Sequence, residues 1–130
     1  MKWIDDFYCF ACGQNNPDGL KLEFFIKDGK IYSEYTFPKK FQGYADVVHG
    51  GLIGLVLDEV MVNLPWRLYK SYVVSAEINV RFKKPVKIGE RLTFMAEIEK
   101  EYKNLVYLKS EAKNESGEVV ATATSKCLRV

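Results

Sequence analysis

One segment constrains the fold of this chain more than any other: the run that begins at Val48 and reads VHGGLIGLVLDEVM. After its glycine pair, the only ionisable residues before Pro65 are Asp58 and Glu59. A helix that is apolar on nearly every side must be buried. We therefore expect a central buried helix over about residues 52–64, ended by Pro65, with the rest of the chain packed around it.

Alternation of apolar and polar residues predicts strands on both sides of this helix. The expected strands cover residues 20–26, 30–37, 74–82, 92–98, 105–113 and 118–129, joined where needed by turns such as Asp28-Gly29 and Lys103-Asn104. A hairpin, a long helix and an antiparallel meander belong to the α+β class, here as one domain over residues 1–130. One sheet covers only one side of a helix, so we expect a second chain to cover the remainder.

Composition excludes several classes of protein. The net charge is +2 and no basic run exceeds two residues, which argues against a nucleic-acid-binding surface. The acidic N-terminus lacks an apolar signal segment, and the longest uncharged stretch, residues 47–57, is too short to cross a bilayer. Three cysteines do not form a disulfide framework. We expect a cytoplasmic protein with no membrane partner.

The two carboxylates are the leading candidates for chemistry, because an ionisable group on an apolar helix is costly unless something satisfies it. Asp58 is the expected catalytic group; the alternative is a structural carboxylate that caps a loop or pairs with a cation. Glu59 points about 100° away around the helix, and we expect it to pair with a basic residue at an interface.

His49-Gly50-Gly51, followed after six residues by Asp58, resembles the signature of the hotdog thioesterases. It is most similar to the PaaI-like branch, with its phenylacetyl-CoA and 4-hydroxybenzoyl-CoA thioesterases. Residues 9–20, CFACGQNNPDGL, and residues 41–44, FQGY, resemble other segments of that branch. The resemblance implies a hotdog fold, in which an antiparallel sheet curls around one long helix. It also implies acyl-CoA thioesterase activity, with coenzyme A as part of the substrate and no further cofactor or metal.

Thioester hydrolysis needs a donor for the developing oxyanion and a base or nucleophile. Backbone N–H groups at a helix N-terminus are free, so Gly50 or its neighbour Gly51 can hold the oxyanion. Asp58 can activate water or attack the carbonyl carbon directly. Gly50 and Asp58 are eight residues apart, or about 12 Å along a helix, so one thioester cannot touch both. We therefore expect a homodimer with sites shared between subunits, as the resemblance also implies; a homotetramer of two dimers stays open.

Two further residues complete the candidate catalytic set. Ser75 begins an alternating face with Glu77, Asn79 and Arg81, and the resemblance implies a Ser or Thr here that orients the water. His49 is the only histidine, and the resemblance makes it a residue that fixes the loop, with general-base catalysis as the alternative.

Candidate substrate-binding residues are basic or aromatic. Arg81, Lys83 and Arg67 could meet the phosphates of coenzyme A, although the first two also fit a solvated strand end. The expected pocket-lining residues are Tyr44, Met61, Trp66 and Tyr72.

Cys9 and Cys12 form a C-x-x-C pair. A zinc site requires four ligands, for which the other candidates are Cys127 and His49. A redox pair normally opens a helix in a βαβ unit, which the pattern lacks. We expect a packed turn with free thiols, with zinc and redox roles as alternatives.

Two other functions compete with hydrolysis. The chain could bind acyl-CoA or another acyl ligand without turning it over, although a pure binder needs no buried carboxylate. A hotdog hydratase would pair Asp with a second His, and the sequence has only one.

Overall fold

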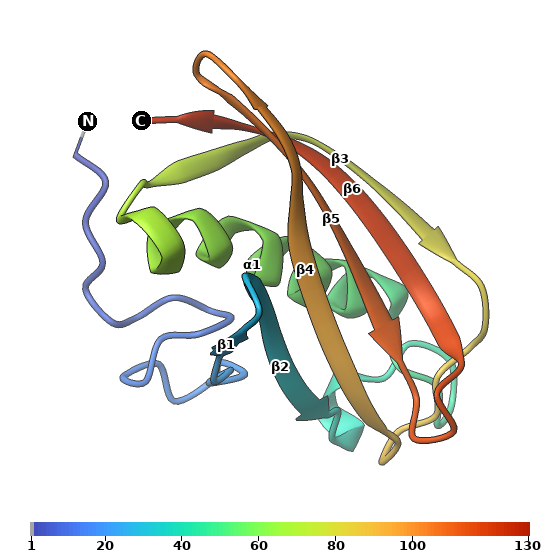
Figure 1. Ribbon diagram of the computed structural model, residues 1–130. Helices are drawn as coiled ribbons and strands as arrows, with labels where there is room; N and C mark the ends of the chain where they lie inside the picture. The colour runs from blue at the N-terminus through green and yellow to red at the C-terminus, as the bar shows by residue number, and fades with distance from the viewer. Residues whose placement is uncertain (1) are drawn as a thin grey trace.

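The computed structural model describes residues 2–130, in which six strands form one sheet around a long helix (Figure 1). The elements are β1 (Phe25–Lys27), β2 (Lys30–Thr36), the short 3-10 helix η1 (Lys39–Phe41), α1 (Gly50–Tyr69), β3 (Val73–Phe82), β4 (Arg91–Tyr102), β5 (Leu105–Lys113) and β6 (Val119–Arg129). All neighbouring strands are antiparallel, and their order is β1-β2-β4-β5-β6-β3. The predicted α+β architecture, with one helix and an antiparallel meander, is confirmed.

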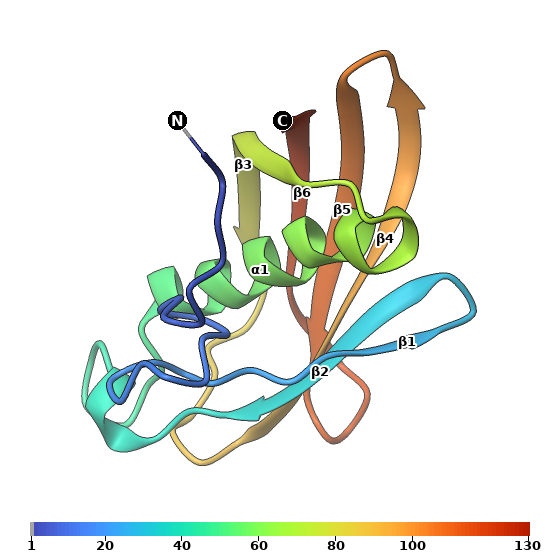
Figure 2. The same ribbon diagram turned by 90° about the vertical axis from the view of Figure 1, so that its left-hand side faces the viewer.

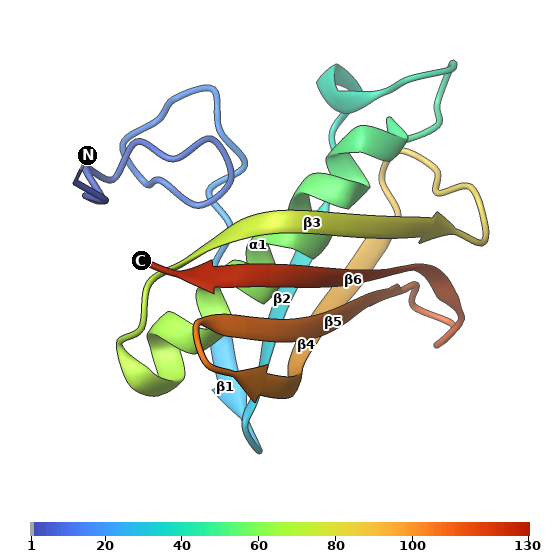
Figure 3. The ribbon, with the colours of Figure 1, turned by 90° about the horizontal axis from the view of Figure 1, so that it is seen from above.

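Strand β3 follows the helix but does not pair with β4. It crosses over to pair with β6, so it forms one edge of the sheet, as Figure 3 shows. Because β6 takes only one side of β3, the backbone N–H and C=O groups on the other side have no strand partner within residues 2–130. An unpaired edge of this kind is a ready template for pairing with another chain.

Helix α1 buries the apolar side that faces the sheet, with side chains that include Val56, Leu57, Val60, Met61 and Leu64. Its other side is covered in part by the segment before β1, which lies across the helix opposite strands β3 to β6 (Figure 2). Some of the cover that we expected from a second chain therefore comes from this chain's own N-terminal segment.

The predicted end of the helix at Pro65 is wrong. Pro65 lies inside α1 and is buried, and the helix continues to Tyr69. The end is set at Lys70, whose backbone is left-handed (φ 58°) and whose N–H donates to the carbonyls of Pro65 and Trp66. Burial and tertiary contacts, such as Arg67 over the Phe24 ring at 4.9 Å, hold the last turn against the loss of one helical hydrogen bond.

The first predicted strand is also much shorter than expected. Only Phe25–Lys27 pairs with β2. Upstream, the N–H groups of Leu20 and Leu22 donate to the carbonyls of Phe10 and Ala11 at 3.0 Å, so this stretch is tied to the N-terminal segment. The alternating pattern did identify a buried face, since Leu20 and Leu22 are both buried.

Candidate active site

The first turn of α1 carries the candidate oxyanion donors. His49 is the N-cap residue, and its Nδ1 accepts a hydrogen bond from Gly51 N–H at 3.0 Å, while its own N–H donates to the carbonyl of Phe41. These two hydrogen bonds hold His49 at the junction between the preceding loop and the helix. Because Gly51 N–H is already used, the free donor is Gly50 N–H, for which residues 2–130 offer no hydrogen-bond acceptor.

A shallow hollow opens beside Gly50. Tyr44 and Lys83 line it together with Phe82. A Cβ atom on Gly50 would lie 3.3 Å from the Phe82 ring, so glycine keeps this approach to the backbone open. A free N–H at the positive end of a 20-residue helix suits an anionic oxygen.

Asp58 and Ser75 form the second candidate centre. Ser75 Oγ donates to Asp58 Oδ1 at 2.6 Å, a short charge-assisted hydrogen bond. Cys127 lies behind the pair, with its Sγ 3.9 Å from Ser75 Oγ. Burial raises the pKa of the Cys127 thiol, and the charge of Asp58 adds to that effect. The thiol therefore stays protonated at neutral pH.

A β-bulge in β3 is what turns Ser75 toward Asp58. The register of β3 against β6 shifts between Ser75 and Glu77: Ser75 pairs with buried Cys127, whereas Glu77 pairs with Lys126. The extra residue reverses the alternation, so the prediction that Ser75 shares a face with Glu77, Asn79 and Arg81 is wrong. Ser75 faces the helix, and Glu77 forms an ion pair with Lys126 at 3.4 Å on the outer face.

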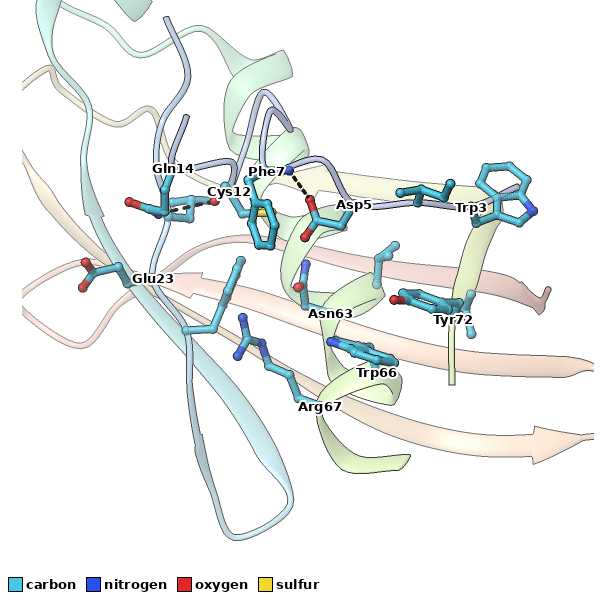
Figure 4. A pocket seen from close by; sticks show the side chains of 15 residues that line it. Trp3, Asp5, Phe7, Cys12, Gln14, Glu23, Asn63, Trp66, Arg67 and Tyr72 are labelled. Carbon is cyan, nitrogen blue, oxygen red and sulfur yellow. Dashed lines mark hydrogen bonds between the residues drawn. The ribbon is translucent and has the colours of Figure 1, made fainter. Parts of the chain in front are cut away.

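A groove of about 1140 Å³ begins one helical turn beyond Asp58 (Figure 4). Val62, four residues after Asp58, and Val73, two residues before Ser75, both line it and lie on the same faces as the pair. Trp66 and Tyr72 line it too and stack at 4.4 Å between ring centroids. The groove therefore begins beside the Asp58–Ser75 pair, and its lining combines aromatic and aliphatic side chains with polar ones such as Arg67.

The expected substrate-binding residues are spread over the chain. Lys83 and Tyr44 lie at the Gly50 hollow. Arg81 lies on the outer face of the sheet, where Lys83 also lines the hollow beside it, and Arg67 lines the groove. Met61 is fully buried in the core, so its expected place in a pocket wall is wrong.

One cluster was not anticipated from the sequence. The Sγ atoms of Cys9 and Cys12 and a carboxylate oxygen of Glu59 lie within 4.8 Å of one another. Glu59 thus meets two thiols within its own chain. The two other zinc ligands that we considered lie elsewhere: His49 caps α1 and Cys127 contacts Ser75 and Ser125. From the sequence we expected a basic partner for Glu59 instead, because Glu59 is 47 residues beyond Cys12 and no local pattern links them.

Within residues 2–130, no helix combines the length and the apolar character needed to cross a membrane.

Comparison with known proteins identifies the family. A family model described as the thioesterase superfamily matches residues 45–121. A protein related to phenylacetic acid degradation from Ralstonia eutropha JMP134 is 26% identical, with a TM-score of 0.75 over 84% of this chain and 85% of that one. The PaaI protein of the E. coli phenylacetic acid degradation operon is 19% identical, with a TM-score of 0.78 over 85% and 80% of the two chains.

A third solved structure is a hypothetical thioesterase from Streptococcus pneumoniae TIGR4 with coenzyme A, which is 18% identical and has a TM-score of 0.76 over 84% of this chain and 85% of that one. No curated protein sequence gives a significant match. These findings confirm the hotdog fold and the resemblance to the PaaI-like branch.

Proposed function

This chain belongs to the thioesterase superfamily, and from that premise we propose that it hydrolyses acyl-CoA thioesters with Asp58 as the group that assists the attack of water. The observation that carries the proposal is the 2.6 Å hydrogen bond from Ser75 Oγ to Asp58 Oδ1, one helical turn before the groove that Val62 and Trp66 line. A carboxylate held in this way, next to a surface that accepts an acyl group, can take a proton from water as the water attacks the thioester carbon.

Gly50 N–H supplies the second requirement. As water attacks, the carbonyl oxygen becomes an oxyanion, which a free backbone N–H at the helix N-terminus stabilises. The tetrahedral intermediate then collapses, the C–S bond breaks, and the thiolate of coenzyme A leaves and takes up a proton. Ser75 holds the Asp58 carboxylate in one orientation and contributes to placing the water.

Both groups act in one reaction only if they come from different subunits, because they lie eight residues apart on the same helix. We infer a homodimer in which Gly50 of one protomer faces Asp58 of its partner. The free edge of β3, which carries exposed Ile78 and Phe82, supports such an assembly. Two dimers could associate further into a tetramer.

Coenzyme A is the proposed carrier, since one solved relative contains coenzyme A and another contains acetyl CoA. Lys83, which lines the Gly50 hollow, is the cation best placed for its phosphates, and Arg81 lines a second hollow together with Lys83. Arg67 is a candidate only if the partner subunit brings it near. The acyl group would extend from Asp58 into the groove, along the stacked rings of Trp66 and Tyr72.

We also propose a cytoplasmic location. The three cysteines, all within residues 2–130, carry free thiols, and free thiols persist in a reducing compartment.

The test is hydrolysis of an acyl-CoA panel, from short and aryl groups to long chains, followed by release of free thiol. We expect Asp58→Asn to lower kcat by about 10²–10⁴-fold, the usual contribution of a general base, while the melting temperature stays close to that of the wild type. Asp28→Asn is the matched control, because Asp28 lies in the exposed β1–β2 turn and its left-handed backbone (φ 53°) also suits Asn.

Near-wild-type hydrolysis by Asp58→Asn would disprove the role of Asp58. If the wild type turned over no acyl-CoA and was only stabilised thermally by the panel, the protein would instead be a non-catalytic acyl-ligand-binding member of the family.

A further inference from the structure

We propose that Cys9, Cys12 and Glu59 form a zinc site that joins the N-terminal segment to α1, with water from the groove as the fourth ligand. The site lies beyond the hydrolytic centre, because Glu59 points to a different side of the helix from Asp58. Neither the family match nor the proposed thioesterase mechanism uses it.

The turn that carries the two thiols is closed by Gly13. Gly13 N–H donates to the carbonyl of Cys9 at 2.9 Å. A Cβ atom on Gly13 would lie 2.3 Å from Cys9 N and 2.6 Å from the carbonyl carbon of Tyr8, so any larger residue would open the turn. The resulting C-x-x-C-G turn brings two cysteine side chains together, which is the spacing of a zinc ligand pair.

Glu59 lies where a third ligand would be needed. Its Oε1 is 3.8 Å from Cys9 Sγ, and the three ligand atoms lie within 4.8 Å of one another. Zn–S bonds of about 2.3 Å and Zn–O bonds of about 2.1 Å at tetrahedral angles put ligand atoms roughly 3.5–3.8 Å apart. A zinc ion therefore fits with small side-chain movements.

The surroundings also suit a metal ligand. Asn63 Nδ2 donates to Glu59 Oε1 at 2.9 Å and holds the carboxylate, as outer-sphere partners of metal ligands do. Thiolate sulfur selects zinc over magnesium or calcium, and the ion would bind as the thiols lose their protons.

The fourth position faces the groove, because Cys12 and Asn63 both line it (Figure 4). The same groove wall includes Trp3 and Phe7 of the N-terminal segment. By fixing this segment to the helix, zinc would hold one wall of the proposed acyl groove in place.

The test is the metal content of the full-length protein, purified with reductant, supplied with zinc and then desalted. We expect about one zinc per chain in the wild type and less than about a tenth of that in Cys9→Ser and Cys12→Ser. Cys127→Ala is the matched control, because Cys127 is buried against Ser75 and Ser125; it should retain the full zinc content.

Cobalt gives an independent readout. The cobalt-loaded wild type should show tetrahedral visible bands and a thiolate-to-cobalt charge-transfer band in the near ultraviolet. Glu59→Gln nearly preserves the shape of the side chain and should weaken zinc binding at least about tenfold. This variant decides the test if the cysteine variants do not fold.

A reduced wild type that retains no zinc would overturn the site, as would Cys9→Ser or Cys12→Ser variants that bind zinc as the wild type does. Neither result would bear on Asp58, because metal content is measured without turnover.

Discussion

At the scale of single residues, the reactive groups depend on neighbours that free or orient them. Gly50 N–H is free because His49 takes the N–H of Gly51 instead. Ser75 reaches Asp58 because one extra residue in β3 turns its side chain inward. In each case a backbone feature, rather than the identity of the reactive residue alone, decides what the side chain or N–H can do.

Gly50→Pro isolates the proposed oxyanion donor. Proline is well tolerated at the first helical position, and His49 already has the extended backbone (φ −62°, ψ 126°) that precedes proline readily, so the helix should still form. Loss of the N–H should lower kcat by about 10²–10³-fold. Steady-state kinetics and thermal melting on the same sample check both expectations.

Gly50→Ala is the control, because it adds the same Cβ near Phe82 but keeps the N–H. The interpretation fails if the two variants lose activity equally.

At the scale of elements, α1 carries the candidate site groups, whereas the centre of the sheet carries ion pairs that join its strands. The helix presents a free N–H at its start and Asp58 two turns later, and its last turns line the groove. The sheet is tied together on its outer face by Glu97 of β4, which pairs with Lys30 of β2 at 3.3 Å and Lys109 of β5 at 3.0 Å. One carboxylate thus bridges three adjacent strands.

This bridge predicts a pH dependence of stability. The hydrogen bond from Lys109, together with Lys30, lowers the pKa of Glu97 below its usual 4.5. A carboxyl group with a lowered folded-state pKa stabilises the fold above its unfolded-state pKa, and that stabilisation is lost as pH falls through the folded-state value. Glu97→Gln should therefore cost up to about 1 kcal/mol at pH 7 and progressively less below pH 4.5.

Urea unfolding at a series of pH values measures this difference. Glu23→Gln is the control, because Glu23 is exposed and outside these ion pairs. A Glu97→Gln penalty that is constant with pH would show that the bridge does not stabilise the fold electrostatically.

At the scale of the whole molecule, one chain holds its two candidate centres apart. The Gly50 hollow and the Asp58–Ser75 centre with its groove are separated by two turns of α1. A two-fold axis that sets two such helices antiparallel would place Gly50 of each protomer beside Asp58 of the other, which gives two equivalent sites. The unpaired edge of β3 is available for the contact between the chains.

Mixing two inactive variants tests this arrangement. Asp58→Asn and Gly50→Pro homodimers should each be nearly inactive, but a mixed dimer keeps one site with both native groups. Random re-association should therefore restore about a quarter of the wild-type activity, since half of the dimers are mixed and half of their sites are intact. The restored activity is measured on mixed dimers that are co-expressed with a different affinity tag on each variant and purified on both tags, so that half of all their sites are intact. If the mixed dimers are no more active than either parent, both groups act within one chain.

The sequence by itself determined the buried helix, the meander and the choice of His49, Gly50 and Asp58 as candidate site residues. Those features are local: a 3.6-residue or two-residue period and a helix N-terminal motif report directly on backbone conformation and burial. The local pattern predicted the helix end incorrectly at Pro65, because packing keeps the helix intact there. It also predicted a strand at residues 20–24, where the buried alternating face packs against the N-terminal segment instead.

Only the tertiary structure decided which groups meet. The bulge that turns Ser75 inward is one residue in the register between β3 and β6, and the contact of Glu59 with Cys9 and Cys12 joins positions far apart in the chain. The tertiary structure also decides that Arg67 lies on a different surface from Lys83 and Arg81. Such juxtapositions depend on strand pairing and packing over long sequence distances, which the period of a single segment does not encode.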